Sequence, residues 1–179
     1  MNDTLAQAFL EDALLQFKKY KAMAEKAVDQ TSDADLFRLI DEDANSMAIV
    51  MKHMAGNMRS RWTDFLTADG EKPDRHRDTE FEMAPTTSRD EVMAVWEAGW
   101  QCVFEALDPL TPPDVLRTVT IRGEPHTVLQ AVNRQLLHYA YHVGQIVLLA
   151  RHFKGPAWQS LSIPRGQSET YKVTPFGRL

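Results

Sequence analysis

The chain has 179 residues, of which 44% are hydrophobic and 25% are charged, a composition that suits one domain with a sizeable core. Its net charge of −5 argues against a dedicated nucleic-acid-binding protein, which needs a positive surface to meet phosphates. The single cysteine, Cys102, excludes an intrachain disulfide framework and a cysteine-rich zinc finger.

Two helices are predicted in the first third of the chain. The first covers about residues 5–28, with Thr4 as its N-cap and apolar residues at helical spacing. A polar linker rich in aspartate, residues 30–45, leads to the second helix at about residues 46–66. The apolar stripe of this second helix consists of Val50, Met54, Met58, Trp62 and Phe65.

A long polar segment, residues 67–86, separates the second helix from the third. Loops of this length in compact domains are usually functional or loosely ordered. Two interpretations stay open: a plain surface loop, or a segment that gates a site and recognises a charged substrate through Arg75 and Arg77. The basic runs at 59–61 and 75–77 are flanked by aspartates, so we expect them to be solvated or to form salt bridges.

Two capping boxes predict where the third and fourth helices begin: Ser88 with Glu91, and Thr127 with Gln130. The third helix should end before Pro109, and the fourth should run to about Phe153 and end at Gly155 and Pro156. Between them, residues 118–126 alternate like a short strand, and hairpin pairing there is allowed but not required.

The predicted fold class is all-α, a four-helix bundle with long connections over residues 1–155 and an irregular tail, 156–179, packed on the same domain. The long connections permit crossovers, so an up-down-up-down order is not forced. The N-terminal residues lack the basic and apolar regions of a signal peptide, and no stretch of 18 apolar residues occurs. We therefore expect a cytoplasmic protein with neither a membrane nor a nucleic acid as partner.

The candidate site begins with two histidines, His138 and His142, inside the apolar run of residues 135–150. Positions four apart on a helix lie about 40° apart on one face, one turn along. Both imidazoles can therefore reach one metal ion. On its own, the pair is equally compatible with two surface histidines on an amphipathic helix.

A third histidine, His53, strengthens the metal hypothesis. It lies beside Val50 and Met54 on the stripe of the second helix, where an imidazole without a partner is costly to bury. The same cost applies to Asn57, one turn later. A bundle can bring His53 opposite His138 and His142, and three neutral imidazoles with an open position are typical of a catalytic metal site.

Other chemistries lack their motifs. Neither His-Glu-x-x-His nor a glutamate three residues before a histidine occurs, which excludes the common zinc-protease motif and the di-iron pairs of ferritin-like bundles. No nucleotide-binding or serine-hydrolase glycine motif is present. The remaining histidines lie in polar loops or at helix ends, where we expect them to be exposed: His76, His126 and His152.

The three histidines, together with Gly144, Gln145 and Ile146 after His142, resemble the DinB-like superfamily of metal-binding four-helix bundles. Three longer segments are similar to an uncharacterised branch of that superfamily: residues 51–82, 138–152 and 158–169. The resemblance covers most of residues 5–170. It implies a four-helix bundle, a divalent metal ion on His53, His138 and His142, and a homodimer.

Some members of the superfamily are metal-dependent transferases that use a small thiol such as bacillithiol or mycothiol. By analogy, the resemblance suggests a thiol S-transferase or a hydrolase with a small-molecule thiol as substrate. The alternative is a non-catalytic, metal-dependent binding or stress-response protein. No further residue matches a catalytic motif, and three imidazoles suit zinc, nickel or iron, so neither the catalytic residues nor the metal is assigned.

Overall fold

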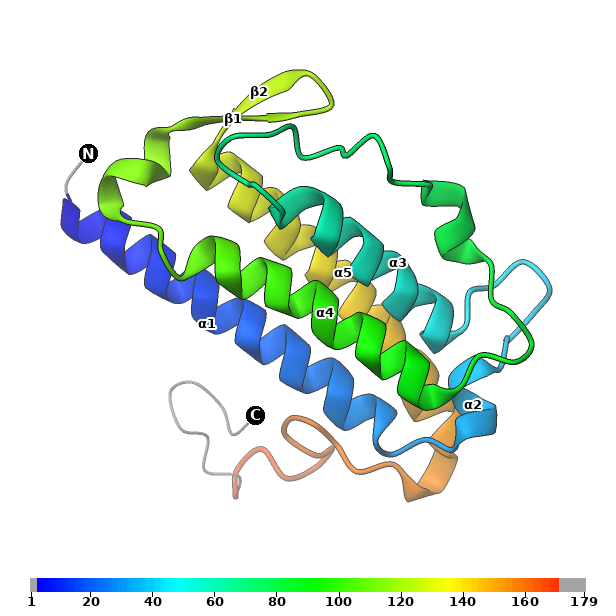
Figure 1. Cartoon of the computed structure of the whole chain (residues 1–179). Helices are drawn as coiled ribbons and strands as arrows, with labels where there is room; N and C mark the ends of the chain where they lie inside the picture. Colours follow the sequence, from blue (N-terminus) through cyan, green and yellow to red (C-terminus); the bar gives the residue numbers. More distant parts are fainter. Residues whose placement is uncertain (1–2, 171–179) are drawn as a thin grey trace.

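The structure, a computed structural model, describes residues 3–170 of the chain. Four long helices lie side by side (Figure 1), which confirms the predicted all-α four-helix bundle. They are α1 (Asp3–Val28), α3 (Met47–Trp62), α4 (Arg89–Leu107) and α5 (Val128–Lys154). The most extensive helix contacts join α3 to α4 and α1 to α5, and α3 also packs on α5.

The apolar core is formed by side chains from all four long helices. The rings of Phe17, Trp96 and Trp100 are fully buried, and Phe17 meets Trp100 edge-on with ring centroids 6.3 Å apart. Burying each such side chain contributes about 1.5–3 kcal/mol. Gly99 lets α4 approach α3 closely, because a Cβ atom at this position would lie 2.8 Å from the Cα atom of Ala55.

The first residues of α3, α4 and α5 agree with the starts predicted from the sequence. Both predicted capping boxes are present, on α4 and α5, and the Ser46 side chain caps α3 by accepting a hydrogen bond from the Ile49 amide. The predicted N-cap at Thr4 is wrong. Since α1 already includes Asp3, Thr4 lies within its first turn.

The second long helix, α3, ends at Trp62, earlier than predicted. Thr63 is extended and Asp64 has a φ of 50°, so the helical hydrogen-bond ladder stops there. Phe65 is nevertheless buried, and its ring packs on Trp62 with a centroid distance of 4.8 Å. The apolar stripe thus continues into the turn and imitates a longer helix in the sequence.

The linker of residues 30–45 contains a short helix that the sequence analysis did not predict, α2 (Asp33–Phe37). Ser32 is its N-cap and accepts a hydrogen bond from the Asp35 amide. Its single buried residue, Leu36, is fully enclosed in the core. A helix of five residues with one buried side chain is too short to leave a periodic signal in the sequence.

Residues 67–86 lie along α3 (Figure 1) and include a 3-10 helix, η1 (Arg77–Phe81). The Lys52 ammonium on α3 donates hydrogen bonds to the carbonyls of Thr79 and Glu82, at 2.8 and 2.6 Å. This segment is therefore tied to the bundle by specific contacts.

A small hairpin closes one end of the bundle, and the pairing left open by the sequence is present. The hairpin consists of β1 (Thr118–Ile121) and β2 (Glu124–Thr127), and a 3-10 helix, η2 (Pro112–Leu116), precedes it. Its two turn residues, Arg122 and Gly123, both have positive φ, as tight two-residue hairpins require. The carboxylate of Asp69 accepts hydrogen bonds from both turn amides, each at 2.8 Å, which links the hairpin to the segment over α3.

After α5, the chain forms a last 3-10 helix, η3 (Gly155–Ala157), and then irregular structure as far as residue 170. Trp158 packs against the core, and Gln159 exchanges two hydrogen bonds with Gln30 at the end of α1. The rest of the predicted tail, residues 171–179, lies outside the described residues. Among the described helices, none is long and apolar enough to cross a membrane.

Candidate metal centre

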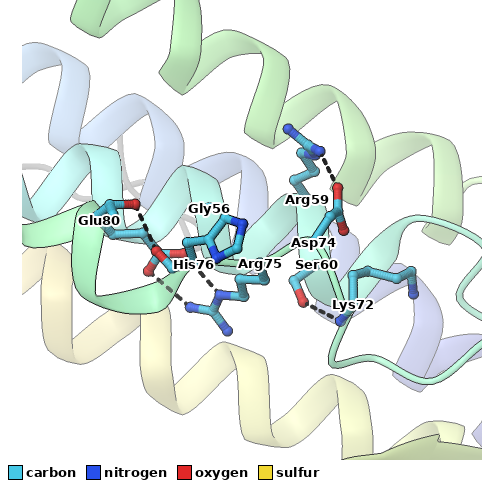
Figure 2. A pocket seen from close by; sticks show the side chains of 9 residues that line it. Gly56, Arg59, Ser60, Lys72, Asp74, Arg75, His76 and Glu80 are labelled. Carbon is cyan, nitrogen blue, oxygen red and sulfur yellow. Dashed lines mark hydrogen bonds and ion pairs between the residues drawn. The ribbon is translucent and has the colours of Figure 1, made fainter.

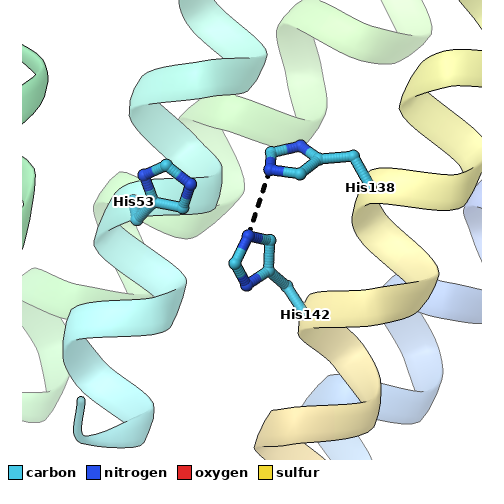
Figure 3. A group of neighbouring side chains, drawn as sticks. All are labelled: His53, His138 and His142. Atoms are coloured by element: carbon cyan, nitrogen blue, oxygen red, sulfur yellow. Dashed lines mark hydrogen bonds between the residues drawn. The ribbon is translucent and has the colours of Figure 1, made fainter. Parts of the chain in front are cut away.

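The three histidines meet between α3 and α5 (Figure 3). His53 comes from α3 and is 4% exposed, whereas His138 and His142 lie one turn apart on α5 and are half-buried. The candidate ligand atoms of all three lie within 4.8 Å of one another. The structure thus brings together the three residues that the sequence singled out.

Hydrogen bonds orient two of the imidazoles. The Nδ1 atom of His53 lies 2.8 Å from Oε2 of Glu80, and Nδ1 of His142 lies 2.8 Å from Oε1 of Gln145. Because both oxygens are acceptors, each Nδ1 carries the proton, and each Nε2 is left with a free lone pair. A carboxylate or amide behind a histidine is the usual arrangement behind a metal ligand.

The sequence analysis missed Glu80, which belongs to η1 in the long polar segment. This carboxylate is 7% exposed and accepts hydrogen bonds from Nε and Nη2 of Arg75, at 2.8 and 3.0 Å. Figure 2 shows Arg75 and Glu80 against α3 at Gly56. A Cβ atom at Gly56 would lie 2.3 Å from Oε1 of Glu80, so glycine leaves the space that Glu80 occupies. An acidic residue in a polar loop gives no sequence signal of this role.

The electrostatics of the cluster favour neutral imidazoles. Burial, reinforced by the charges of His142 and His53, lowers the pKa of His138 to about 3. Burial also lowers the pKa of His142, against the opposing effect of its hydrogen bond to Gln145. Burial opposes ionisation of Glu80, but its hydrogen bonds from His53 and Arg75 outweigh this and hold its pKa below the usual value. At neutral pH the centre therefore combines neutral imidazoles at His138 and His142 with an ionised carboxylate at Glu80.

The spacing of the histidines fits a shared ion. The Nε2 atoms of His138 and His142 lie 3.0 Å apart. Two nitrogens bound at about 2.0–2.1 Å to one tetrahedral ion are about 3.3 Å apart, so only a small adjustment is needed. In the structure, Nε2 of His138 donates a hydrogen bond to Nε2 of His142, because the proton of His142 is on its Nδ1 atom.

Two other expectations concern neighbours of the cluster. Asn57 has the partner that its burial demands, because its Oδ1 accepts a hydrogen bond from the hydroxyl of Tyr139, at 3.1 Å. That hydroxyl accepts one from Nε1 of Trp62, at 2.9 Å. The remaining histidines lie outside the cluster: His76 and His152 are exposed and His126 is half-buried.

The arginines of the two basic runs form salt bridges, one of the two outcomes expected from the sequence. Arg59 forms a surface ion pair with Asp74. The side chains of Arg61 and Arg75, by contrast, are each 5% exposed, and both pair with glutamates of the segment 67–86. The predicted salt bridges are therefore present, and those of Arg61 and Arg75 are buried, which the sequence did not show.

Together, the fold and the cluster define a helical-bundle protein with a partly buried three-histidine group that could hold a metal ion. The chain belongs to the family described as "Protein of unknown function (DUF1572)", whose model matches residues 4–167. No curated protein and no solved structure matches the chain.

Proposed function

We propose that this chain is a DinB-like metalloprotein in which His53, His138 and His142 bind one divalent metal ion. The observation that carries the proposal is the convergence of three imidazoles, two of them with Nδ1 fixed by an acceptor. The sequence resemblance implies the same three residues. Neutral imidazoles suit zinc, nickel or iron, so the donor set fits a first-row ion without selecting one.

The centre is proposed to be catalytic rather than structural. Among residues 3–170, the cluster contains three ligands, whereas structural zinc sites are usually closed by four. When bound, the ion supplies a Lewis acid that favours the anionic, nucleophilic form of a small thiol. The chain holds the imidazoles in place through Glu80 and Gln145, and Arg75 holds Glu80. We therefore infer a metal-dependent transferase that uses a small thiol.

The test compares two histidines of α5. Untagged protein is purified and its metal content is measured, and cobalt is then loaded before a simple thiol is added. The wild-type chain and His152→Ala should bind one ion per chain and develop a sulfur-to-metal charge-transfer band. His138→Ala should lose the ion, with an affinity decrease beyond the roughly 10- to 100-fold of a supporting residue.

Full metal occupancy in His138→Ala would refute the site. A bound ion without a charge-transfer band for any thiol would instead favour the non-catalytic metal-binding protein.

We also propose a homodimer, through the outer face of α5. Leu137, Tyr141 and Leu148 are 75%, 64% and 67% exposed on this helix, and apolar residues gathered on one face are typical of an interface.

Light scattering should give about twice the chain mass of 20.4 kDa. The charged variant Leu137→Glu should give the monomer. Val95→Glu, which places the same charge at a half-exposed valine of α4, should stay dimeric. A monomeric wild-type chain at micromolar concentration would contradict the proposal.

A further inference from the structure

A cavity of about 180 Å³ adjoins the histidine cluster. His53 and His138 form part of its wall. Much of the remaining wall consists of arginines contributed by α3, the segment over α3, the hairpin and α5: Arg61, Arg75, Arg77, Arg122 and Arg134. Residues distant in the sequence therefore build one basic cavity beside the candidate metal ligands, in a chain whose net charge is negative.

Only part of this positive charge is neutralised within the protein. Glu71 accepts hydrogen bonds from Arg61 and Arg122, at 2.9 and 2.8 Å. Glu80 accepts those of Arg75. Two carboxylates thus serve three of the five guanidinium groups.

The other two arginines are available to a ligand. The nearest carboxylate to Arg77 belongs to Asp78, 4.0 Å away with a fully exposed side chain. Arg134 has no carboxylate partner among residues 3–170. Both therefore contribute charge that no buried carboxylate balances.

Two residues that line the cavity each have a buried polar atom without a hydrogen-bond partner among the described protein groups: Oε1 of Gln135 and Nε of Arg61. Gln135 is 3% exposed and Arg61 is 5% exposed. Leaving such groups unpaired costs free energy, so buried polar atoms normally have partners. A ligand with an acceptor for Arg61 and an N–H or O–H donor for Gln135 would satisfy both.

We propose that this cavity binds the anionic group, a carboxylate or a phosphate, of the small molecule on which the histidine centre acts. Guanidinium groups bind both anions through paired, charge-assisted hydrogen bonds. Arg77 and Arg134 supply the free charge, and Gln135 accepts a hydrogen bond from a neighbouring hydroxyl or N–H of the same molecule. The link to a substrate rests on the proposed function, whereas anion binding itself does not require the metal.

The experiment measures anion binding by calorimetry at low ionic strength, with the full chain both as purified and after treatment with a chelator. The probes are inorganic phosphate, succinate, its hydroxylated analogue malate, and uncharged succinamide. Arg77→Gln and Arg134→Gln should each weaken binding of the preferred anion about tenfold or more, as expected for loss of a hydrogen bond between charged groups. Arg151→Gln is the matched control, because Arg151 is an exposed arginine of the same helix as Arg134 and lies outside the cavity.

Gln135→Met provides a second variant that should still fold, since it removes a buried oxygen that has no partner. It should abolish any preference for malate over succinate and leave the melting temperature unchanged or higher. Preference for phosphate would assign a phosphorylated substrate, and preference for the dicarboxylates a carboxylate.

Four results would overturn the proposal: no binding of any anion, equal binding of succinamide, the same loss in Arg151→Gln, or anion binding only when metal is present. If anions bind the chelated chain but no metal binds to the histidines, the cavity stands and the proposed function falls.

Discussion

The two buried regions of the bundle are built on different principles. Around Phe17, Trp96 and Trp100 the core is apolar and closely packed. Around His53 it contains a carboxylate, Glu80, and the nearly buried guanidinium of Arg75. Apolar burial stabilises a fold directly, whereas a buried ion pair must first offset the loss of its hydration and is weak support for stability. The first region therefore stabilises the bundle, whereas the second contributes little stability and orients His53.

The largest expected effect on stability tests the apolar region. Trp100→Ala removes a fully buried ring that packs on Phe17, Trp96 and Tyr139. We expect a loss of about 3–5 kcal/mol in the free energy of unfolding, measured by urea denaturation. The metal content of the molecules that remain folded should not change. A loss of metal without a loss of stability would show that the two regions are not distinct.

The opposite pattern is expected for Glu80→Gln. This change keeps the size of the side chain but removes the charge that accepts the hydrogen bonds of His53 and Arg75. Metal affinity should fall about 10- to 100-fold, as for other residues that support a ligand. Competition with a chromophoric chelator measures this. An unchanged metal affinity would show that the hydrogen bond between Glu80 and His53 does not support metal binding.

Two helical glycines, Gly56 and Gly144, test how closely Glu80 fits against α3. At Gly56 a methyl group would collide with Glu80, whereas at Gly144 it would meet nothing within 4 Å. Gly144→Ala should therefore stabilise the chain by about 0.5–1 kcal/mol and leave metal affinity unchanged. Gly56→Ala should lose this gain and bind metal more weakly, because Glu80 must move. Thermal unfolding and metal titration of both variants provide the measurement, and equal behaviour would contradict the close fit at Gly56.

The charged region should also make the stability of the chain depend on pH. The pKa of His138 is lowered to about 3 and that of His142 is also lowered, so between their ordinary range near 6.5 and the lowered values the unfolded chain binds more protons. Stability is then fully present above about pH 6.5 and declines as the pH falls towards 3. Urea denaturation of the chelated chain at pH 7.5, 6.5 and 5.5 tests this. The free energy of unfolding should change less with pH in His138→Phe. An equal change in this variant would show that His138 does not cause the pH dependence.

The number of long helices, two capping boxes and the histidine pair on α5 could all be read from the sequence. Each of these depends on residues close in the chain: a repeat of about 3.6 residues, a serine or threonine three residues before its partner, or two histidines one turn apart. Even there, a local pattern misled at α3, where buried Phe65 continues the apolar stripe beyond the helix end.

The surroundings of the histidines could not be read from the sequence. Glu80 is one of 25 acidic residues, and nothing local marks it as the partner of His53. The five cavity arginines come from α3, the segment over it, the hairpin and α5, and Gln135 resembles any polar helix residue. Their roles depend on contacts between segments distant in the chain, and the path of residues 67–86 over α3 sets those contacts. Because a hydrogen bond or an ion pair acts over a few ångströms, only the packed bundle determines which of these groups meet.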